Sequence, residues 1–239
     1  MVALLLAACG APPIRHAAPP IVGEPAVPAA RIYRIDASQS ELRILVYRGG
    51  PLARFGHNHV MINHAISGSV EWGEEASASA FRFDVPAAGF VVDDPKARRE
   101  EGDQFAGEIP DEAKAGTLRN MLGAAVLDAD EYPMLTVRSV AAFARPAAAG
   151  DGAWSATVAI SIAGHESTID VPFTLAGDQD RLSASGSMEL RQSALGLSPF
   201  SLMLGALKVE NALTIKFRIV AGTTRRTFPS TGSASPPVP

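Results

Sequence analysis

Apolar and polar residues alternate along two neighbouring stretches of the chain. Every second residue from Trp154 to Ile162 is apolar, and the same rhythm returns from Ser167 to Leu175. A period of two is typical of a β-strand with one buried face, and the short segment Ala163–His165 between the stretches is typical of a turn. The pattern therefore predicts a β-hairpin. Pro172 has no backbone N–H to give to a neighbouring strand, which predicts a sheet edge or a bulge there.

Six further stretches show a similar alternation. They are Leu42–Val46, Ile66–Trp72, Phe81–Val85, Leu135–Phe143, Leu182–Leu190 and Leu213–Ile219. About eight strands joined by short turns are typical of an antiparallel up-and-down barrel or a sandwich. Apolar residues on one side only also disfavour a parallel sheet that is covered on both faces. We therefore predict a single all-β domain over residues 31–221.

One segment interrupts the alternation. Residues 93–112 hold eight acidic and three basic side chains, and such a long excursion between strands is typical of a lid, a binding loop or a structural plug. The following stretch, Asp111–Leu122, has a partial apolar face and a capping residue in Asp111, which predicts a short helix. Clustered like charges on a loop are typical of a solvated surface. The carboxylates interpreted in this way are those of Asp93, Asp94, Glu100 and Glu101.

The start of the chain resembles a secretory signal that ends in a lipidation site. An apolar run leads into Leu6-Ala7-Ala8-Cys9, which matches the bacterial lipobox, although no Lys or Arg precedes the run. We expect residues 1–9 to be a signal remnant, with Cys9 lipidated and anchored in a membrane on the periplasmic side. Gly10 stands where an inner-membrane retention signal has aspartate, which favours the outer membrane. The alternative is a buried cysteine in an ordinary apolar N-terminus.

Composition narrows the range of partners. Residues 10–30 are rich in Ala and Pro, which predicts an extended tether, and residues 222–239 are mostly Ser, Thr, Gly and Pro, which predicts a disordered tail. The net charge of −4 and the pI near 5.7 argue against a nucleic-acid partner, which needs a basic surface. They also argue against attraction to an anionic membrane surface.

A histidine pair is the one feature that predicts metal or acid–base chemistry. His57 and His59 are two residues apart, so on a strand their imidazoles lie on the same face, which suits two ligands of a zinc or copper ion. His64, or an acidic side chain of residues 93–112, is the candidate third ligand. The alternative is a pair of hydrogen-bonded histidines at a barrel rim. No known catalytic motif accompanies the pair, so we expect a binding protein rather than an enzyme.

Several segments resemble, in their order and spacing, the motifs of one known family. They are Tyr33–Ser40, Leu118–Leu122, Leu127–Pro133, Ser161–Ser167, and Arg191 with Leu195–Leu197. The family is the YceI-like one, which is associated with polyisoprenoid binding. The resemblance implies an eight-stranded lipocalin-like barrel whose lumen accepts an isoprenoid or another lipid. The segment Gly56–His64 departs from the family's common form, and the charged insertion is long.

The resemblance also implies a ligand site. An eight-stranded barrel is wide enough to hold one slender ligand, or to be filled by its own side chains. The residues expected to form the lumen wall are Phe81, Phe83, Trp154 and Phe173, and the alternative is that they are simply core. Arg191 is expected to pair with a head-group phosphate, and its alternative role is a structural ion pair.

The implied function is the binding, sequestration or transport of an isoprenoid-like or other lipid ligand in the bacterial cell envelope. No further cofactor is expected. A metal-binding protein or metal-dependent enzyme built on His57 and His59 is the alternative, and a purely structural role in the envelope is a third. The sequence leaves open whether the chain is a monomer or a homodimer.

Overall fold

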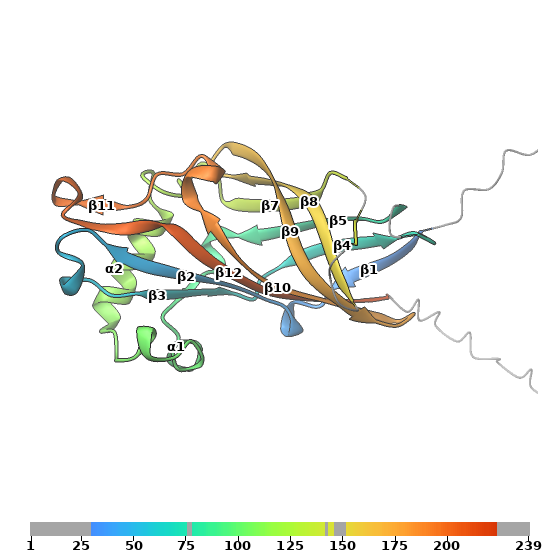
Figure 1. The fold of residues 1–239 in the computed structure, drawn as a ribbon, viewed down its shortest axis with the longest axis horizontal. Coiled ribbons are helices and arrows are strands. Elements are labelled where there is room, and N and C mark those ends of the chain that lie inside the picture. The colour runs from blue at the N-terminus through green and yellow to red at the C-terminus, as the bar shows by residue number, and fades with distance from the viewer. Residues whose placement is uncertain (1–29, 76–77, 142, 146–151, 224–239) are drawn as a thin grey trace, which may run out of the picture.

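Eight antiparallel strands form a closed ring. The computed structural model describes residues 30–75, 78–141, 143–145 and 152–223. Around the ring, the strands are β1 (Arg31–Ile35), β4 (Ser67–Trp72), β5 (Ala80–Pro86), β7 (Met134–Ser139), β8 (Ala153–Ile162), β9 (His165–Gly177), β10 (Arg181–Arg191) and β12 (Leu207–Thr223). The ring closes because β1 pairs with both β4 and β12. The predicted all-β barrel is confirmed, and Figure 1 shows that it is elongated.

Three further strands extend the wall at one end of the barrel. β2 (Glu41–Gly49) pairs with β12 where β1 no longer does, β3 (His59–Asn63) pairs with β2, and β6 (Val91–Val92) pairs with β3. Three positions in the barrel wall are therefore each occupied by two strands that follow one another in the sequence: β1 and β2, β3 and β4, and β5 and β6. Among the described residues, β6 has no strand on its other side. The helix α2 (Asp111–Leu122) lies against β6 there and contributes Leu118, Met121 and Leu122 to the core.

Part of the charged segment, residues 93–112, is packed against the barrel instead of being exposed to solvent. Its short helix α1 (Pro95–Glu100) packs on the outer face of β2 and β3, where Ala97 and Phe105 cover Leu45. The side chain of Glu101 is buried and bonds to Arg43 and Lys216. The solvent-facing interpretation is therefore wrong for Glu101 and Asp93, which are both buried.

The other two carboxylates of the charged segment, Asp94 and Glu100, are not fully buried, and the predicted helix forms. Asp94 caps α1 by accepting hydrogen bonds from the backbone N–H groups of Lys96 and Ala97, and Glu100 is partly exposed and pairs with Arg43. The predicted helix forms as α2, but Pro110 occupies its N-cap position and Asp111 is the first helical residue. No helix in the described part of the chain is long and apolar enough to cross a lipid bilayer.

The predicted hairpin is confirmed as β8 and β9. Its two-residue turn, Ala163 and Gly164, has φ values of 47° and 75°, as a type I′ turn requires. The ladder between β9 and β10 ends at Thr174, opposite Ser185. Leu175 donates its N–H to the carbonyl oxygen of Gly152 on the β8 side. Backbone nitrogens of a strand point alternately to its two neighbours, so the nitrogen of Pro172, three residues earlier, points toward β10. Proline cannot donate there, and the predicted interruption lies at this seam.

The boundaries of the domain shift slightly. β12 continues through Gly222 and Thr223, two residues beyond the predicted end, and pairs there with β1 and β10. The short strand β11 (Ser201–Leu202) pairs with the start of β12. The predicted signal remnant with Cys9, nearly all of the predicted tether and the rest of the predicted tail lie outside the described residues.

Candidate functional site

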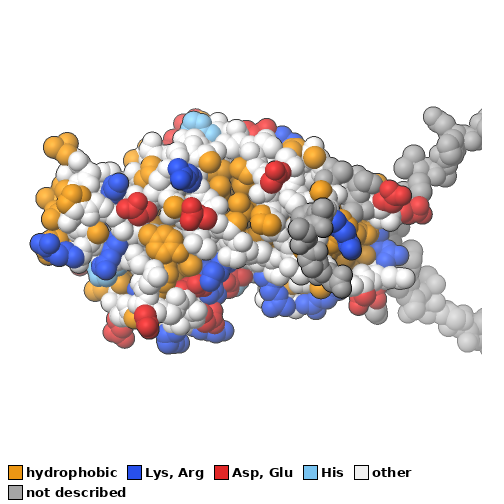
Figure 2. Space-filling view, viewed as in Figure 1, with side chains coloured by type: hydrophobic (Ala, Val, Ile, Leu, Met, Phe, Trp, Pro, Cys, Tyr) orange, Lys and Arg blue, Asp and Glu red, His pale blue; other side chains and the backbone are white. Residues whose placement is uncertain are grey.

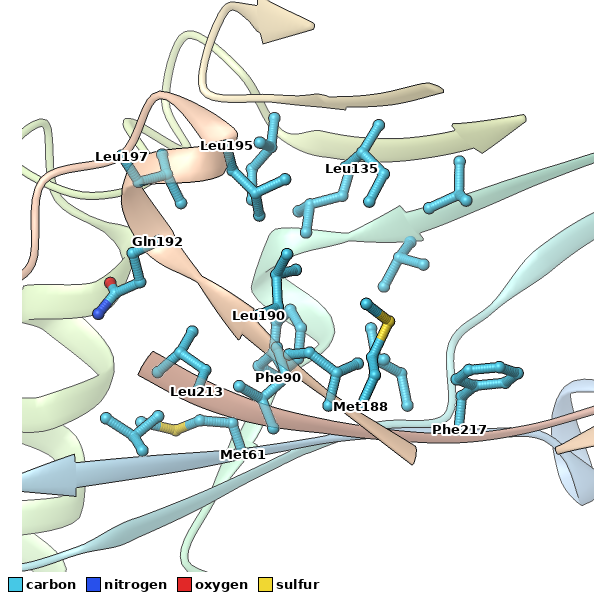
Figure 3. A pocket seen from close by; sticks show the side chains of 18 of the residues that line it. Met61, Phe90, Leu135, Met188, Leu190, Gln192, Leu195, Leu197, Leu213 and Phe217 are labelled. Atoms are coloured by element: carbon cyan, nitrogen blue, oxygen red, sulfur yellow. The ribbon is translucent and has the colours of Figure 1, made fainter. Parts of the chain in front are cut away.

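An apolar cavity of about 470 Å³ runs inside the barrel. Its wall consists of the inward-facing residues of the strands, because successive side chains of a strand point to opposite faces. Figure 3 shows Met188 and Leu190 of β10 and Leu213 and Phe217 of β12 pointing into the same space as Leu135 of β7. Except for Leu135 these side chains are only half-buried, although they lie inside the barrel. The lumen is therefore not filled by its own side chains, and its volume lies within the range of small-molecule sites.

Three of the four aromatic residues predicted to line the lumen lie on its wall. Phe81 and Phe83 of β5 stack with their ring centroids 4.6 Å apart, and Phe173 of β9 is part of the same wall. Trp154 lies opposite Phe173 in the β8–β9 register but lines a smaller neighbouring pocket, which shares Leu175 and Leu182 with the cavity. The guanidinium of Arg145 lies over the Trp154 ring, 4.6 Å from its centroid. Contact between these side chains and a ligand stays a prediction.

Arg191 lies away from the cavity. Its neighbours Leu190 and Gln192 are on the wall, whereas Arg191 is exposed on the outer face of β10 and makes no ion pair with the described residues. Gln192 takes the inner position instead. It is buried, and its amide donates a hydrogen bond to the carbonyl oxygen of Glu210.

The cavity opens at one end of the barrel, which we call the mouth. Five wall residues are exposed to solvent, and all lie at this end: Arg48, His57, Asn120, Leu202 and Lys208. Arg48 is held in place by its neighbours, because its guanidinium donates to the carbonyl oxygen of Gly56 and its backbone N–H donates to Asn58. The mouth therefore combines cationic and amide groups, whereas the rest of the wall is apolar.

A buried carboxylate fixes one of the mouth histidines. Nδ1 of His59 lies 2.6 Å from Oδ2 of Asp93, and Oδ1 of Asp93 accepts hydrogen bonds from Arg98 and from the backbone N–H of Val60. Burial alone raises the pKa of Asp93, but the hydrogen bonds from His59 and Val60, with the nearby charges, outweigh it and hold the pKa below its usual value. The carboxylate thus stays ionised and sets the orientation of the imidazole at the cavity wall.

The structure does not assemble a metal centre from the predicted ligands. The rings of His57 and His59 lie edge to face with their centroids 6.2 Å apart. His64 is directed elsewhere, with Nδ1 on the carbonyl oxygen of Ser40. Within the described ranges, no group of three or more His, Cys, Asp or Glu side chains is placed to hold an ion. His59 is instead hydrogen-bonded at the barrel rim, as the alternative interpretation expects, and His57 is exposed beside it.

Sequence reasoning missed Arg48 and Lys208, and it brought an acidic side chain of residues 93–112 to the histidine pair without singling out Asp93 as the partner of His59. Arg48 continues the even-numbered alternation of Leu42–Val46, so the same pattern that located the wall also places Arg48 on it. No comparable signal exists for Asp93, because its contact with His59 depends on how β6 pairs with β3.

Known proteins share the fold of this chain. A family model described as the YceI-like domain matches residues 33–221. The crystal structure of BcnA from Burkholderia cenocepacia has a TM-score of 0.55 and 19% sequence identity, over 78% of this chain and 98% of that one. A polyisoprenoid-binding domain from Saccharophagus degradans, implicated in plant cell wall breakdown, has a TM-score of 0.53 and 10% identity, over 80% and 98%. These likenesses show the fold, and no curated protein matches the chain in sequence.

Proposed function

Because this chain belongs to the YceI-like domain family, we propose that its barrel binds and carries a polyisoprenoid or another long lipid chain in the lumen. The observation that carries the proposal is the apolar cavity, which the side chains of the wall leave unfilled and which opens at one end. A slender hydrocarbon chain fits such a space. The polyisoprenoid-binding domain of similar fold supports the same ligand class.

The mouth favours a ligand with an acidic head group. Sites of this kind are mostly apolar, with a few polar groups that orient the ligand. Here the polar groups include the guanidinium of Arg48 and the ammonium of Lys208, neither of which pairs with a carboxylate among the described residues. Arg48 lies on the cavity wall, so it is better placed than Arg191 to meet a phosphate or carboxylate.

Native mass spectrometry of the protein purified gently from its own host tests this proposal. Met188→Trp adds bulk inside the lumen, and Ser187→Trp adds the same side chain on the exposed outer face of the same strand. We expect a bound lipid on the wild type and on Ser187→Trp, and at least a tenfold loss of occupancy in Met188→Trp. A lumen that carries no lipid in any of the three proteins contradicts the proposal.

We further propose that the protein works in the periplasm, held to a membrane through a lipidated Cys9. The support is the lipobox-like Leu6-Ala7-Ala8-Cys9, and a second anchoring signal or a second acyl chain makes such attachment stable. Mass analysis of the N-terminal peptide from the host's membrane fraction is expected to find a chain that begins at Cys9 with acyl groups on it. A mature chain that retains residues before Cys9, found in the soluble fraction, contradicts this.

A further inference from the structure

Four large apolar side chains project into solvent beside the mouth. We call Phe55, Leu202, Met203 and Leu204 the apolar tip. Phe55 is 64% exposed, Met203 is 71% exposed and Leu204 is fully exposed. They come from two loops that lie together, because the N–H of Leu52 donates to the carbonyl oxygen of Ala206 over 2.8 Å. Figure 2 shows hydrophobic side chains gathered at this end of the molecule, with basic side chains next to them.

The backbone of the apolar tip is strained. Met203 and Leu204 have φ values of 52° and 54°, a left-handed conformation that large side chains rarely adopt. The conformation holds both side chains outward, although neither gains burial there. Strain of this kind is typical of functional sites, where the surrounding structure maintains it for a purpose other than stability.

Basic residues surround the apolar tip. Arg48, Arg54 and Lys208 are exposed, and none of them pairs with a carboxylate in the described residues. The guanidinium of Arg54 lies 4.5 Å from the centroid of the Phe55 ring. The acidic residue closest in sequence, Glu210, is half-buried with its carboxylate against Gly49. The tip is therefore locally cationic, although the whole chain has a net charge of −4.

We propose that the apolar tip docks on an anionic lipid bilayer. Exposed apolar side chains with Lys and Arg at their edge match the acyl–headgroup boundary of such a membrane. Leu202 belongs both to the tip and to the cavity wall, so docking places the mouth directly against the lipid. A hydrocarbon chain then passes between bilayer and lumen without crossing water. The inference goes beyond lipid binding in the lumen, because it names the surface at which the lipid enters.

Vesicle co-sedimentation tests the docking. The full chain carries Cys9→Ser, so that no acyl chain can anchor it, and is mixed with vesicles of phosphatidylcholine alone or with added phosphatidylglycerol. We expect binding to the anionic vesicles only, and weaker binding as salt is added. Arg54→Gln with Lys208→Gln is expected to weaken this binding by about tenfold or more, because each basic residue near the surface contributes about fivefold.

A glycine variant separates docking from stability. Met203→Gly with Leu204→Gly removes the inserted side chains but suits the left-handed backbone, so we expect at least a tenfold loss of vesicle binding with no fall in the thermal unfolding temperature. Ile32→Ser is the matched control, because it removes an exposed apolar side chain from β1, which pairs with the far end of β12. Its binding is expected to equal that of the parent.

Tryptophan fluorescence tests whether the apolar tip enters the bilayer. Phe55→Trp places a tryptophan on the tip, whereas the native Trp72 and Trp154 lie in the aromatic cluster away from it. Brominated phospholipids are expected to quench the emission of Phe55→Trp and to leave that of the parent unchanged.

Three results would overturn the proposal. They are the absence of binding to anionic vesicles, glycine-variant binding equal to that of the parent, and a fall in oligomeric state of the glycine variant in lipid-free solution without a change in vesicle binding. The last would identify the tip as a contact between two copies of the chain. No lumen ligand is added in these measurements, so their failure leaves the proposed lipid binding inside the barrel untouched.

Discussion

Asp93 shows at the scale of one residue how the charged segment contributes to the site. Its carboxylate is fully buried between His59, Arg98 and the backbone of Val60. Burial raises the pKa of this carboxyl, and the hydrogen bonds lower it further than burial raises it, so the pKa in the fold lies below the usual value. A carboxyl of this kind stabilises the fold above the pKa of the unfolded chain. That stabilisation is lost as the pH falls through the folded-state pKa.

Asp93→Asn is therefore expected to lower the free energy of unfolding by about 3 kcal/mol near neutral pH, because it leaves Arg98 buried without its charged partner. The difference from the wild type is expected to begin shrinking below about pH 4, where the carboxyl of the unfolded chain takes up a proton, and to go on shrinking until the pH has fallen through the lower folded-state pKa. Urea unfolding at a series of pH values measures both. Asp94→Asn is the control, because asparagine still caps α1. A difference that stays constant with pH would show that the charge of Asp93 does not stabilise the fold.

The sequence predicted which residues face the lumen but not the contact between Asp93 and His59. Alternation placed Phe81, Phe83 and Phe173 on the inner face, and the structure puts them on the cavity wall. It also placed Trp154 on the inner face, but Trp154 lines the neighbouring smaller pocket, which shares Leu175 and Leu182 with the cavity. The contact between Asp93 and His59 joins residues far apart in sequence, and only strand pairing decides it.

At the scale of elements, Gly116 and Gly186 show how much space is left at α2 and between β9 and β10. Gly116 lies inside α2, and a Cβ there meets only the guanidinium of Arg119 at 3.8 Å. Gly186 lies on β10, where a Cβ would come within 2.5 Å of the Phe217 ring and 2.6 Å of the carbonyl oxygen of Pro172. The strands therefore stay close at Gly186, although their hydrogen-bonded ladder has ended.

Opposite effects are expected from the same substitution at these positions. Gly116→Ala should raise the free energy of unfolding by about 1 kcal/mol, because alanine favours the helix. Gly186→Ala should lower it by about 1–3 kcal/mol, because the added methyl group overlaps its neighbours. Thermal and urea unfolding provide the measurement. A gain at Gly186 would mean that β9 and β10 are further apart than the structure shows.

The elements themselves were largely predictable from the sequence. Eight alternating stretches correspond to strands of the barrel wall, and the break in the β9–β10 ladder follows from the missing N–H of Pro172. Three positions around the barrel are each shared by two strands, and this was not predictable, because alternation gives the faces of a strand but not the strand with which it pairs. Leu45 is apolar at a position of Leu42–Val46 where the alternation expects a polar residue, because α1 and Phe105 cover the outer face of β2 there.

At the scale of the whole molecule, shape and charge point to the same end. The cavity opens at the mouth, and the apolar tip lies there with Arg48 and Lys208, which pair with no carboxylate among the described residues. The net charge predicts no attraction to an anionic surface. It sums the charges of the whole chain, however, and so does not show that cations gather at the mouth. The lumen carries the proposed function, because it is an apolar space that the side chains of the chain do not fill.

A crystal structure of the protein purified gently from its own host tests that claim most directly. We expect continuous elongated density along the lumen, in contact with Met188, Leu190 and Phe217, and ending in a head group near Arg48. Side chains of opposite strands that meet across the lumen, with no density between them, would contradict the account.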